Sequence, residues 1–205
     1  MGLTDAARAG TLLFLGVLQF GILLVVAEAL SPSFSVSSNY VSDLGKVFPS
    51  SAPVFNSSIA LMGCLVIGSA YFLLKAFRSR LLAVVPALAG VGLIGVGAFP
   101  EGSPYALHDV FSVVAFLFIG LAAIVARRFQ RPPLSYFSVI LGAATLVTMV
   151  AYVPTSPAGS VGNSLGIGVG GLEQMIIYPV LLWSLAFAGH LMGSEGGDGA
   201  AKSGS

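Results

Sequence analysis

The stretch LHDVFSVVAFLFIGLAAIVARRFQR, residues 107–131, contains in one piece the pattern that governs the whole chain. It opens with His108 and Asp109, has no charged residue from Val110 to Ala126, and closes with three arginines. A helix that crosses a bilayer needs about 20 mostly apolar residues. The stretch therefore predicts a membrane-spanning helix with polar groups at one end and basic groups at the other.

The composition extends this prediction to the whole chain. Hydrophobic residues make up 56% of the 205 residues and charged residues 8%, with a mean hydropathy of +0.96. Soluble domains usually carry about 25% charged residues, and a soluble fold of this length has too little interior to hide so much apolar surface. We therefore expect the lipid bilayer as the surrounding medium. The net charge of +1, without a basic tract, predicts no nucleic-acid partner.

The single cysteine, Cys64, excludes a disulfide within the chain, and we expect it to be a small buried side chain in a helix. The first apolar run follows Arg8 and ends in Ala27-Glu28-Ala29, which also resembles a cleavable signal peptide. The run is long for a signal peptide, so a retained helix is the preferred interpretation.

Six stretches have the length and the apolar character of membrane spans. The predicted fold is therefore all-α, an integral membrane bundle of six transmembrane helices in residues 1–193, followed by a disordered Gly/Ser-rich tail at 194–205. Pro49, Pro154 and Pro157 are among the prolines that fall in or beside the connections, where helix-breaking residues belong. The predicted spans are Thr11–Leu30, Ser57–Phe77, Leu81–Phe99, Leu107–Ala126, Leu134–Val153 and Ile167–Met192.

Small residues recur in the third span at Ala83, Gly90 and Gly97, seven residues apart. Such a stripe lets two helix backbones approach closely in a membrane, and we expect it at a helix–helix contact. Gly166 and Gly170, at the start of the sixth span, have the same interpretation.

Basic residues predict the orientation, because Lys and Arg accumulate in cytoplasmic loops. With alternating spans, Arg8, the bases of residues 75–80, those of residues 127–131 and Lys202 all fall on one side, and Lys46 alone falls on the other. We therefore expect both termini in the cytoplasm and the chain in the cell membrane. Five acids gather at the opposite, extracytoplasmic ends of the spans: Glu28, Asp43, Glu101, Asp109 and Glu173.

Several segments resemble a known family when they are read in order. They are SNYVSDLG at 38–45, FN at 55–56, GVGAFPEG at 95–102, HDVFS at 108–112 and GGLEQMIIYPVLLW at 170–183. Together they resemble the family catalogued as domain of unknown function 998, prokaryotic membrane proteins with six helices. The resemblance covers the chain from the first span to the sixth. It implies the architecture but no activity.

A more limited resemblance covers about twenty residues of the first connection. VSDLG, a following proline and Phe55 are similar to the first outer loop of the Frag1/DRAM/Sfk1 proteins, eukaryotic multi-helix proteins of which one branch is linked to lipid remodelling. This resemblance implies a lipid or lipid-linked ligand at the outer leaflet.

The residues with chemical potential gather at the acidic side. His108 and Ser112 share a helix face, as a base and a hydroxyl do in nucleophilic catalysis, and Asp43, Glu101 or Glu173 would orient the imidazole. We therefore predict Asp43, His108, Ser112 and Glu173 as catalytic candidates. The ligand-binding candidates are Asn39, Tyr40, Ser42, Asn56, Glu101 and Asp109, with a cap for the second span as the alternative role of Asn56.

The same residues leave other functions open. His108 with several carboxyl groups suits a divalent metal, although no tight ligand motif is present. Cofactors and the oligomeric state stay unknown at this stage. A carrier or an accessory subunit competes with a lipid-binding or lipid-modifying protein, but a carrier usually has polar residues through the midplane. Here the midplane has little beyond Gln19, Thr145 and Thr148.

The polar segment Asn39–Asp43 joins the first two spans at the acidic side. It has many hydrogen-bonding groups and little net charge, and Gly45 and the prolines that follow supply turns. We expect this segment to fold back over the mouth of the bundle, toward His108 and Glu173.

Overall fold

A computed structural model describes residues 2–152 and 166–193 of the chain. Within these ranges the structure is helical, has no strand, and contains six helices that are long and apolar enough to cross a membrane. Short 3-10 helices, η1 to η3, lie in the connections. The predicted tail at 194–205, Pro154 and Pro157 lie outside the described residues. The long helices are α1 (Asp5–Ala29), α2 (Ala52–Phe77), α3 (Arg80–Ala98), α4 (Leu107–Ala126), α5 (Leu134–Tyr152) and α7 (Gly168–Gly193).

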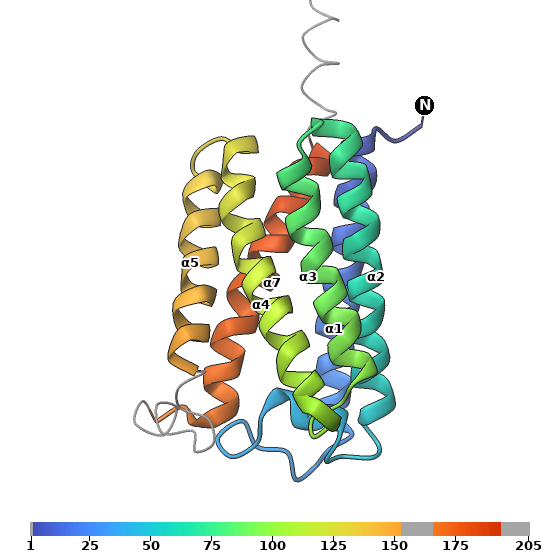
Figure 1. The fold of residues 1–205 in the computed structure, drawn as a ribbon, viewed down its shortest axis with the longest axis vertical. Coiled ribbons are helices and arrows are strands. Elements are labelled where there is room, and N and C mark those ends of the chain that lie inside the picture. The colour runs from blue at the N-terminus through green and yellow to red at the C-terminus, as the bar shows by residue number, and fades with distance from the viewer. Residues whose placement is uncertain (1, 153–165, 194–205) are drawn as a thin grey trace, which may run out of the picture.

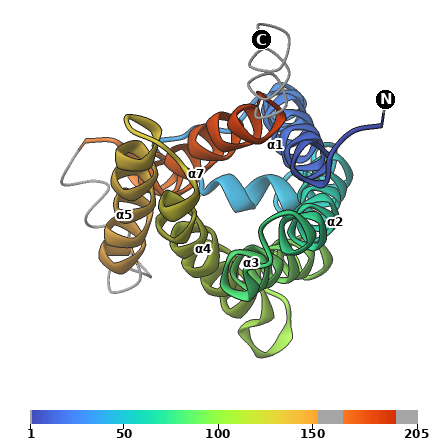
Figure 2. The same cartoon turned by 90° about the horizontal axis from the view of Figure 1, so that it is seen from above.

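The long helices form one bundle, with five of them in a ring and the sixth outside it. Neighbours in the ring are α1 and α2, α2 and α3, α3 and α4, and α1 and α7, while α4 and α7 close the ring with a smaller contact. Helix α5 packs on α4 and α7 from outside, as Figures 1 and 2 show. The predicted all-α membrane bundle is thus confirmed.

The predicted spans agree with these helices, except at two starts: α1 begins at Asp5, six residues before the predicted Thr11, and the other difference is in α2. That helix begins at Ala52, five residues before the predicted Ser57, and its first turn contains Pro53. Proline fits there because the first turn of a helix has no backbone partner for the missing N–H group. Asn56 therefore lies inside the helix, and the prediction that it caps this helix was wrong.

Glycines set the closest helix contacts, as predicted for the third span. A Cβ atom added at Gly90 would lie 2.7 Å from the Gly63 carbonyl oxygen, and one added at Gly63 would lie 2.6 Å from the Gly90 carbonyl oxygen. Gly97 packs equally closely on the Asn56 carbonyl, and Ala83 on the same stripe is buried. The α2–α3 pair is therefore in direct backbone contact along its length.

Polar side chains inside the bundle mostly join neighbouring helices. Gln19 donates from Nε2 to the Ser58 carbonyl at 2.9 Å, which is the interhelical bond expected of a lone midspan glutamine. Thr145 donates to the Ile176 carbonyl at 3.0 Å and so joins α5 to α7. Trp183 donates to the Ser138 hydroxyl at 2.9 Å. The donors of these three side chains are thus used in contacts between helices, while Oε1 of Gln19 is buried without a partner among the described residues.

One prediction about the interior was wrong. Cys64 was expected to be buried, but it is exposed on the outer face of α2. The same surface carries Leu61 and Tyr71, which are also exposed. In a bilayer, apolar side chains on the outer face contact lipid, so burial against protein is not required of them. A small thiol is compatible with either position, which is why the sequence pattern did not distinguish them.

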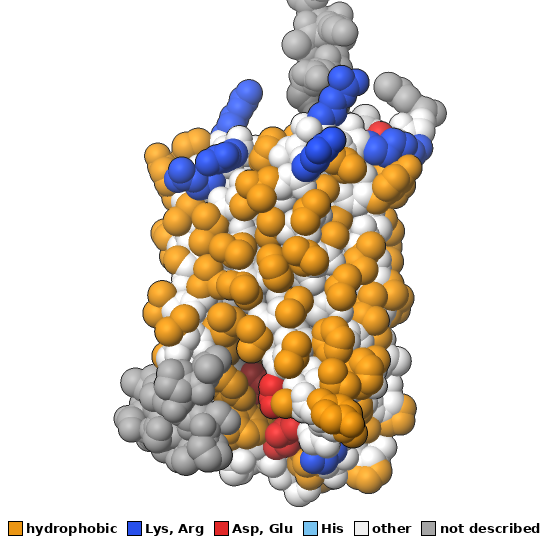
Figure 3. Space-filling model, in the orientation of Figure 1, with side chains coloured by type: hydrophobic (Ala, Val, Ile, Leu, Met, Phe, Trp, Pro, Cys, Tyr) orange, Lys and Arg blue, Asp and Glu red, His pale blue; other side chains and the backbone are white. Residues whose placement is uncertain are grey.

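The two ends of the bundle differ in charge. Figure 3 shows Lys and Arg side chains concentrated at one end, which we call the basic end, and Asp and Glu side chains gathered in a patch near the other, the acidic end. Asp5 belongs to the basic end, where it pairs with Arg8 and Lys75. The separation of charge along the bundle thus agrees with alternating membrane crossings.

We expect Gly90→Leu to destabilise the protein in detergent, because the side chain has no room against the Gly63 backbone. Overpacking of this kind typically lowers the free energy of unfolding by about 1–3 kcal/mol. Thermal unfolding of purified protein measures the effect. Gly189→Leu is the matched control, because a Cβ atom at Gly189 meets nothing within 4 Å. Equal melting of Gly90→Leu and wild type would contradict the packing.

Candidate binding site at the acidic end

The connection between α1 and α2 is held against the first turn of α7. The backbone N–H groups of Gly170 and Gly171 donate to the Val36 carbonyl at 3.0 and 3.2 Å. This approach requires glycine, because a Cβ atom at Gly170 would lie 2.2 Å from the Asn39 carbonyl oxygen. The predicted packing role of Gly170 is thus confirmed, although its partner is the connecting segment and not another long helix. Gly166, by contrast, has nothing near its Cβ position.

The next part of the connection, η1 (Val41–Gly45), crosses the end of the bundle (Figure 2). Val41 and Leu44 have exposed fractions of 0%, so the apolar face of η1 closes the interior. Ser51 donates to the Leu44 carbonyl at 2.8 Å, and Asn56 donates from Nδ2 to the Gly45 carbonyl at 2.9 Å. The predicted fold-back of this segment is therefore confirmed. Asn56 holds the end of η1 and is not among the residues that line the pocket described below.

Glu173 on α7 fixes the start of η1. Its side chain is 6% exposed, and Oε2 accepts a hydrogen bond of 2.6 Å from the backbone N–H of Val41. The backbone N–H of Ser42 also donates to this carboxyl group. A buried carboxyl group must be paired or hydrogen-bonded to be tolerated. Glu173 thus satisfies two N–H groups that η1 leaves without partners, and is satisfied by them in return.

Asp43 and Asn39 shape the same segment from within. Asp43 accepts at Oδ2 from the backbone N–H of Tyr40 at 3.0 Å and from Nδ2 of Asn39 at 3.3 Å. Asn39 in turn accepts from the backbone N–H of Ser35 at 3.1 Å. These contacts give both residues a positioning role, since they hold the turn that leads into η1.

Glu101 lies beside this turn, after the end of α3. Ser42 donates to Oε2 of Glu101 at 3.5 Å, and the carboxyl groups of Glu101 and Asp43 are hydrogen-bonded to each other. Burial raises the pKa of Glu101 above its ordinary value, and the hydrogen bond and charge of Asp43 raise it further, while the charge of Lys46 lowers it. Burial, followed by the charges of Glu101, Glu173 and Asp43, also raises the pKa of the Tyr40 hydroxyl.

His108, at the start of α4, is held by a backbone group. Its Nδ1 atom lies 3.0 Å from the Phe99 carbonyl oxygen. A carbonyl oxygen only accepts, so Nδ1 carries the hydrogen and Nε2 is the remaining ring nitrogen. The sequence suggested Asp43, Glu101 or Glu173 as the group that orients the imidazole, whereas the hydrogen bond seen in the structure is the one to the Phe99 carbonyl.

These residues surround a polar pocket of about 280 Å³ between α4, α5 and α7, which we call the mouth pocket. Its position matches the patch of acidic side chains visible in Figure 3. The walls combine carboxyl groups, two tyrosines, His108 and Ser112 with a few apolar side chains. The lining residues are Tyr40, Ser42, Glu101, His108, Asp109, Ser112, Val113, Phe116, Met149, Tyr152 and Glu173.

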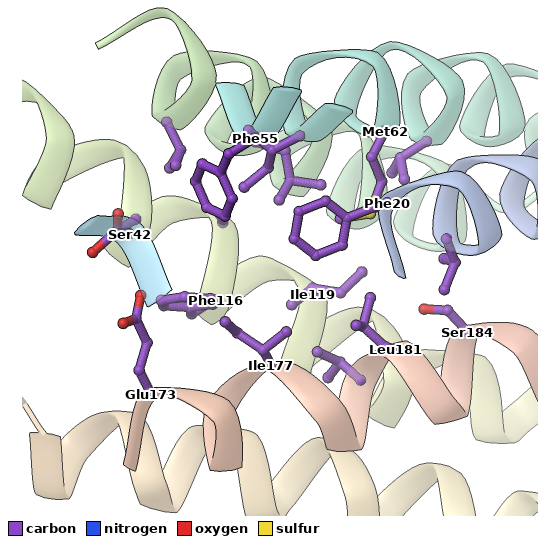
Figure 4. A pocket seen from close by; sticks show the side chains of 18 of the residues that line it. Phe20, Ser42, Phe55, Met62, Phe116, Ile119, Glu173, Ile177, Leu181 and Ser184 are labelled. Carbon is purple, nitrogen blue, oxygen red and sulfur yellow. The ribbon is translucent and has the colours of Figure 1, made fainter. Parts of the chain in front are cut away.

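A second, apolar cavity of about 60 Å³ lies next to the mouth pocket, inside the bundle. The two share wall residues, among them Ser42, His108, Phe116 and Glu173. Figure 4 shows Glu173 and Ser42 at one end of this apolar cavity and Ser184 at the other, with Phe20, Phe116, Ile177 and Leu181 between them. The acidic end thus has a polar compartment next to an apolar one, with several side chains in the walls of both.

The carboxyl groups of the mouth pocket have no ion pair. Among the described residues, the ion pairs within 4.0 Å are Arg8–Asp5 and Lys75–Asp5, both at the basic end. In the same part of the chain, no group of three or more His, Cys, Asp and Glu side chains is placed to hold a metal ion. The donor set considered for a metal, His108 with the four carboxyl groups, is therefore not assembled as a coordination site in this structure.

Seven of the ten predicted site residues line the mouth pocket: Tyr40, Ser42, Glu101, His108, Asp109, Ser112 and Glu173. Asn39, Asp43 and Asn56 lie behind it and position η1. The fifth acid, Glu28, lies apart from this group beside Tyr178.

Residues that sequence reasoning missed include Tyr152, Met149 and Phe116. The ring of Tyr152 lies edge-on to that of Tyr40, with the centroids 6.0 Å apart. A signal for Tyr152 existed, because it ends the fifth span on the same side as the acids. Met149 and Phe116 carry no such signal, because a helix in lipid is apolar on all its faces.

The family predicted from the sequence is confirmed. The model of the family described as protein of unknown function (DUF998) matches residues 14–190, and the chain belongs to this family. Comparisons with curated proteins and with solved structures find no match. The family's description gives no activity, so function has to be argued from the site.

The raised pKa of Glu101 predicts a pH dependence of stability. A carboxyl group with a raised pKa holds its proton more tightly in the folded protein, so it favours folding in acid. This contribution is lost as the pH rises from the ordinary value of 4.5 through the raised value. The midpoint of thermal unfolding in detergent should therefore fall over this pH range, and Glu101→Gln should reduce the fall. Glu101→Asp keeps a titrating group and is the control, and an unchanged pH profile for Glu101→Gln would contradict this account.

Proposed function

We propose that this member of the DUF998 family binds a membrane lipid at the acidic end, with the headgroup in the mouth pocket and an acyl chain in the apolar cavity. The observation behind the proposal is that the two compartments lie next to each other and share wall residues, so that one ligand could occupy both if the shared side chains leave a passage. A molecule that is polar at one end and apolar at the other matches this pair of environments, and lipids are the abundant molecules of that kind around a membrane protein.

The depth of the apolar cavity supports a lipid chain. Glu173 and Ser184 on α7 both line it and lie about 16 Å apart by the helical rise of 1.5 Å per residue. The hydrocarbon core of a bilayer is about 30 Å thick, so this depth is close to that of one leaflet. The volume is smaller than a whole chain needs. A water occupies roughly 10–15 Å³ of such space, so 60 Å³ holds about four to six groups of that size. An acyl chain larger than this volume fits only if the side chains that line the apolar cavity move.

A carrier for small polar solutes fits these cavities less well. The walls of the apolar cavity are almost wholly hydrophobic below the mouth, and Ser184 is the polar residue at its inner end. Gln19 and Thr145, the midplane polar residues considered earlier, donate to backbone carbonyls of neighbouring helices. A polar solute would find no series of hydrogen-bonding partners toward the basic end.

The proposal is binding and not hydrolysis, for a geometric reason. His108 and Ser112 line the same pocket, but among the described residues no hydrogen bond joins them. A nucleophilic serine is activated by a base in contact with it. The structure places His108 and Ser112 in one pocket without a hydrogen bond between them. A lipid-modifying reaction therefore ranks behind lipid binding.

We also propose that the acidic end faces outward, which would make the outer leaflet the source of the lipid. The basic side chains at the other end support this orientation through the positive-inside rule. In this arrangement both termini lie in the cytoplasm, and the protein sits in the cell membrane.

Labelling of single cysteines in intact cells tests the orientation. In a Cys64→Ala background, Ser50→Cys at the acidic end should react with a membrane-impermeant thiol reagent. Arg131→Cys at the basic end should react only after the cells are opened. The opposite pattern would reverse the orientation and move the proposed site to the cytoplasmic leaflet.

Filling the apolar cavity tests lipid binding. Ile177 lines this cavity, so Ile177→Trp should block the space that the chain needs and weaken lipid binding by about tenfold or more. Native mass spectrometry of the purified protein with a short-chain phospholipid measures the bound fraction. Leu182→Trp, at a 60% exposed position on the same helix, is the matched control and should bind as wild type does. If Ile177→Trp binds the lipid as tightly as wild type does, the acyl chain does not lie in the apolar cavity.

A further inference from the structure

We infer that the mouth pocket selects a lipid headgroup that carries a primary ammonium group, as in an ethanolamine headgroup. This inference rests on the proposed lipid binding and goes beyond it by naming the headgroup chemistry. Four observations support it. They are the carboxyl groups that line the pocket, the lack of an ion pair to them among the described residues, the Nε2 atom of His108, and the two tyrosines at the rim.

The acidic side chains that line the pocket are three carboxyl groups, and among the described residues no Lys or Arg lines it. Glu101, Asp109 and Glu173 contribute carboxyl groups, and Asp43 stands behind them hydrogen-bonded to Glu101. The hydrogen bond between Glu101 and Asp43 requires a proton on one of the two, and the other carboxylates only accept hydrogen bonds. A ligand rich in N–H donors is therefore complementary to them. A headgroup that ends in an acidic or phosphate group would place like charges together, which disfavours binding.

The protein offers little positive charge of its own to these carboxyl groups. None of them has an ion pair within 4.0 Å among the described residues, and the nearest base is Lys46, whose charge acts on Glu101. Residues 153–165, which lie outside the described ranges, contain no Lys, Arg or His in their sequence. Several carboxyl groups in one pocket beside the bilayer are costly without a cation. A bound ammonium group would relieve that cost.

His108 provides an observation that is independent of the acids. Its side chain is 7% exposed and lines both cavities, and Nδ1 is occupied by the Phe99 carbonyl. Nε2 has no hydrogen-bond partner among the described residues. In the neutral ring with hydrogen on Nδ1, Nε2 is an acceptor. Nε2 is not among the fully buried side-chain atoms that lack a partner, so it is open to the pocket, where a donor from the ligand can reach it.

The tyrosines at the rim suit a cation but do not form a closed cage. Tyr40 and Tyr152 line the mouth and meet edge-on, with ring centroids 6.0 Å apart. Aromatic faces attract cations, and cages of several rings recognise quaternary ammonium groups. Here the two tyrosines are accompanied by three carboxyl groups, Glu101, Asp109 and Glu173, so recognition depends on N–H donors. A primary ammonium group has three such donors, whereas a trimethylammonium group has none.

Native mass spectrometry of the full-length protein in detergent tests this choice with three dioctanoyl phospholipids. Their headgroups are ethanolamine, choline and glycerol, so chains and phosphate are matched and only the terminal group differs. The ethanolamine lipid should bind about tenfold more tightly than the other two. The double variant Glu101→Gln with Asp109→Asn should lose this preference, because it removes two of the charged acceptors. Glu28→Gln, which changes an acid outside the pocket, should keep it.

Each alternative result has a distinct meaning. Equal binding of the three lipids, or tighter binding of the choline lipid, would overturn the ammonium inference and leave lipid binding in place. Failure of all three lipids to bind would overturn the proposed function itself. Displacement of the ethanolamine lipid by free ethanolamine at the same concentration would support ammonium recognition but show that the ligand is a soluble amine.

Discussion

The contact between the Glu173 carboxyl group and the backbone N–H of Val41 is the interaction on which the rest of the acidic end depends. Glu173 is on α7, and Val41 begins the short helix η1 in the connection between α1 and α2. The contact therefore joins two parts of the chain that are far apart in sequence. It places η1 across the bundle, and η1 in turn brings Tyr40 and Ser42 to the mouth pocket. Without it, the pocket would lose one of its walls.

Close backbone packing makes this contact possible. Gly170, one turn before Glu173, lets the connection lie directly on α7. At the other end of η1, Asn56 holds the Gly45 carbonyl from the second turn of α2. Hydrogen bonds to neighbouring elements thus hold η1 at both ends, and its apolar residues are buried between them. In a membrane protein, where hydrophobic burial distinguishes protein from lipid only weakly, such specific contacts decide the arrangement.

Much of the fold was predictable from the sequence because the bilayer imposes a simple rule on helices. Length and apolar character predicted six spans, and the stripe of small residues around Gly90 predicted a close helix–helix contact, which the structure shows between α2 and α3. Seven of the ten predicted residues line one pocket, and they stood out in the sequence because polar side chains are rare in such a chain. The separate functions of these residues were not predictable. Asp43 and Asn56 turned out to make local contacts with η1, and the apolar cavity carries no sequence signal, because its walls have the same composition as the lipid-facing surface.

Amide hydrogen exchange of Val41 and Ser42 tests the central claim most directly, since both N–H groups donate to Glu173. A hydrogen bond to a charged group contributes about 1.5–3 kcal/mol, and each 1.4 kcal/mol is tenfold in an equilibrium. We expect both amides to exchange slowly in the wild-type protein in nanodiscs and at least about tenfold faster in Glu173→Ala, with Ser112→Ala as a control that exchanges as wild type does. Fast exchange of these two amides in the wild-type protein would contradict the account, because it would mean that η1 is not held across the bundle.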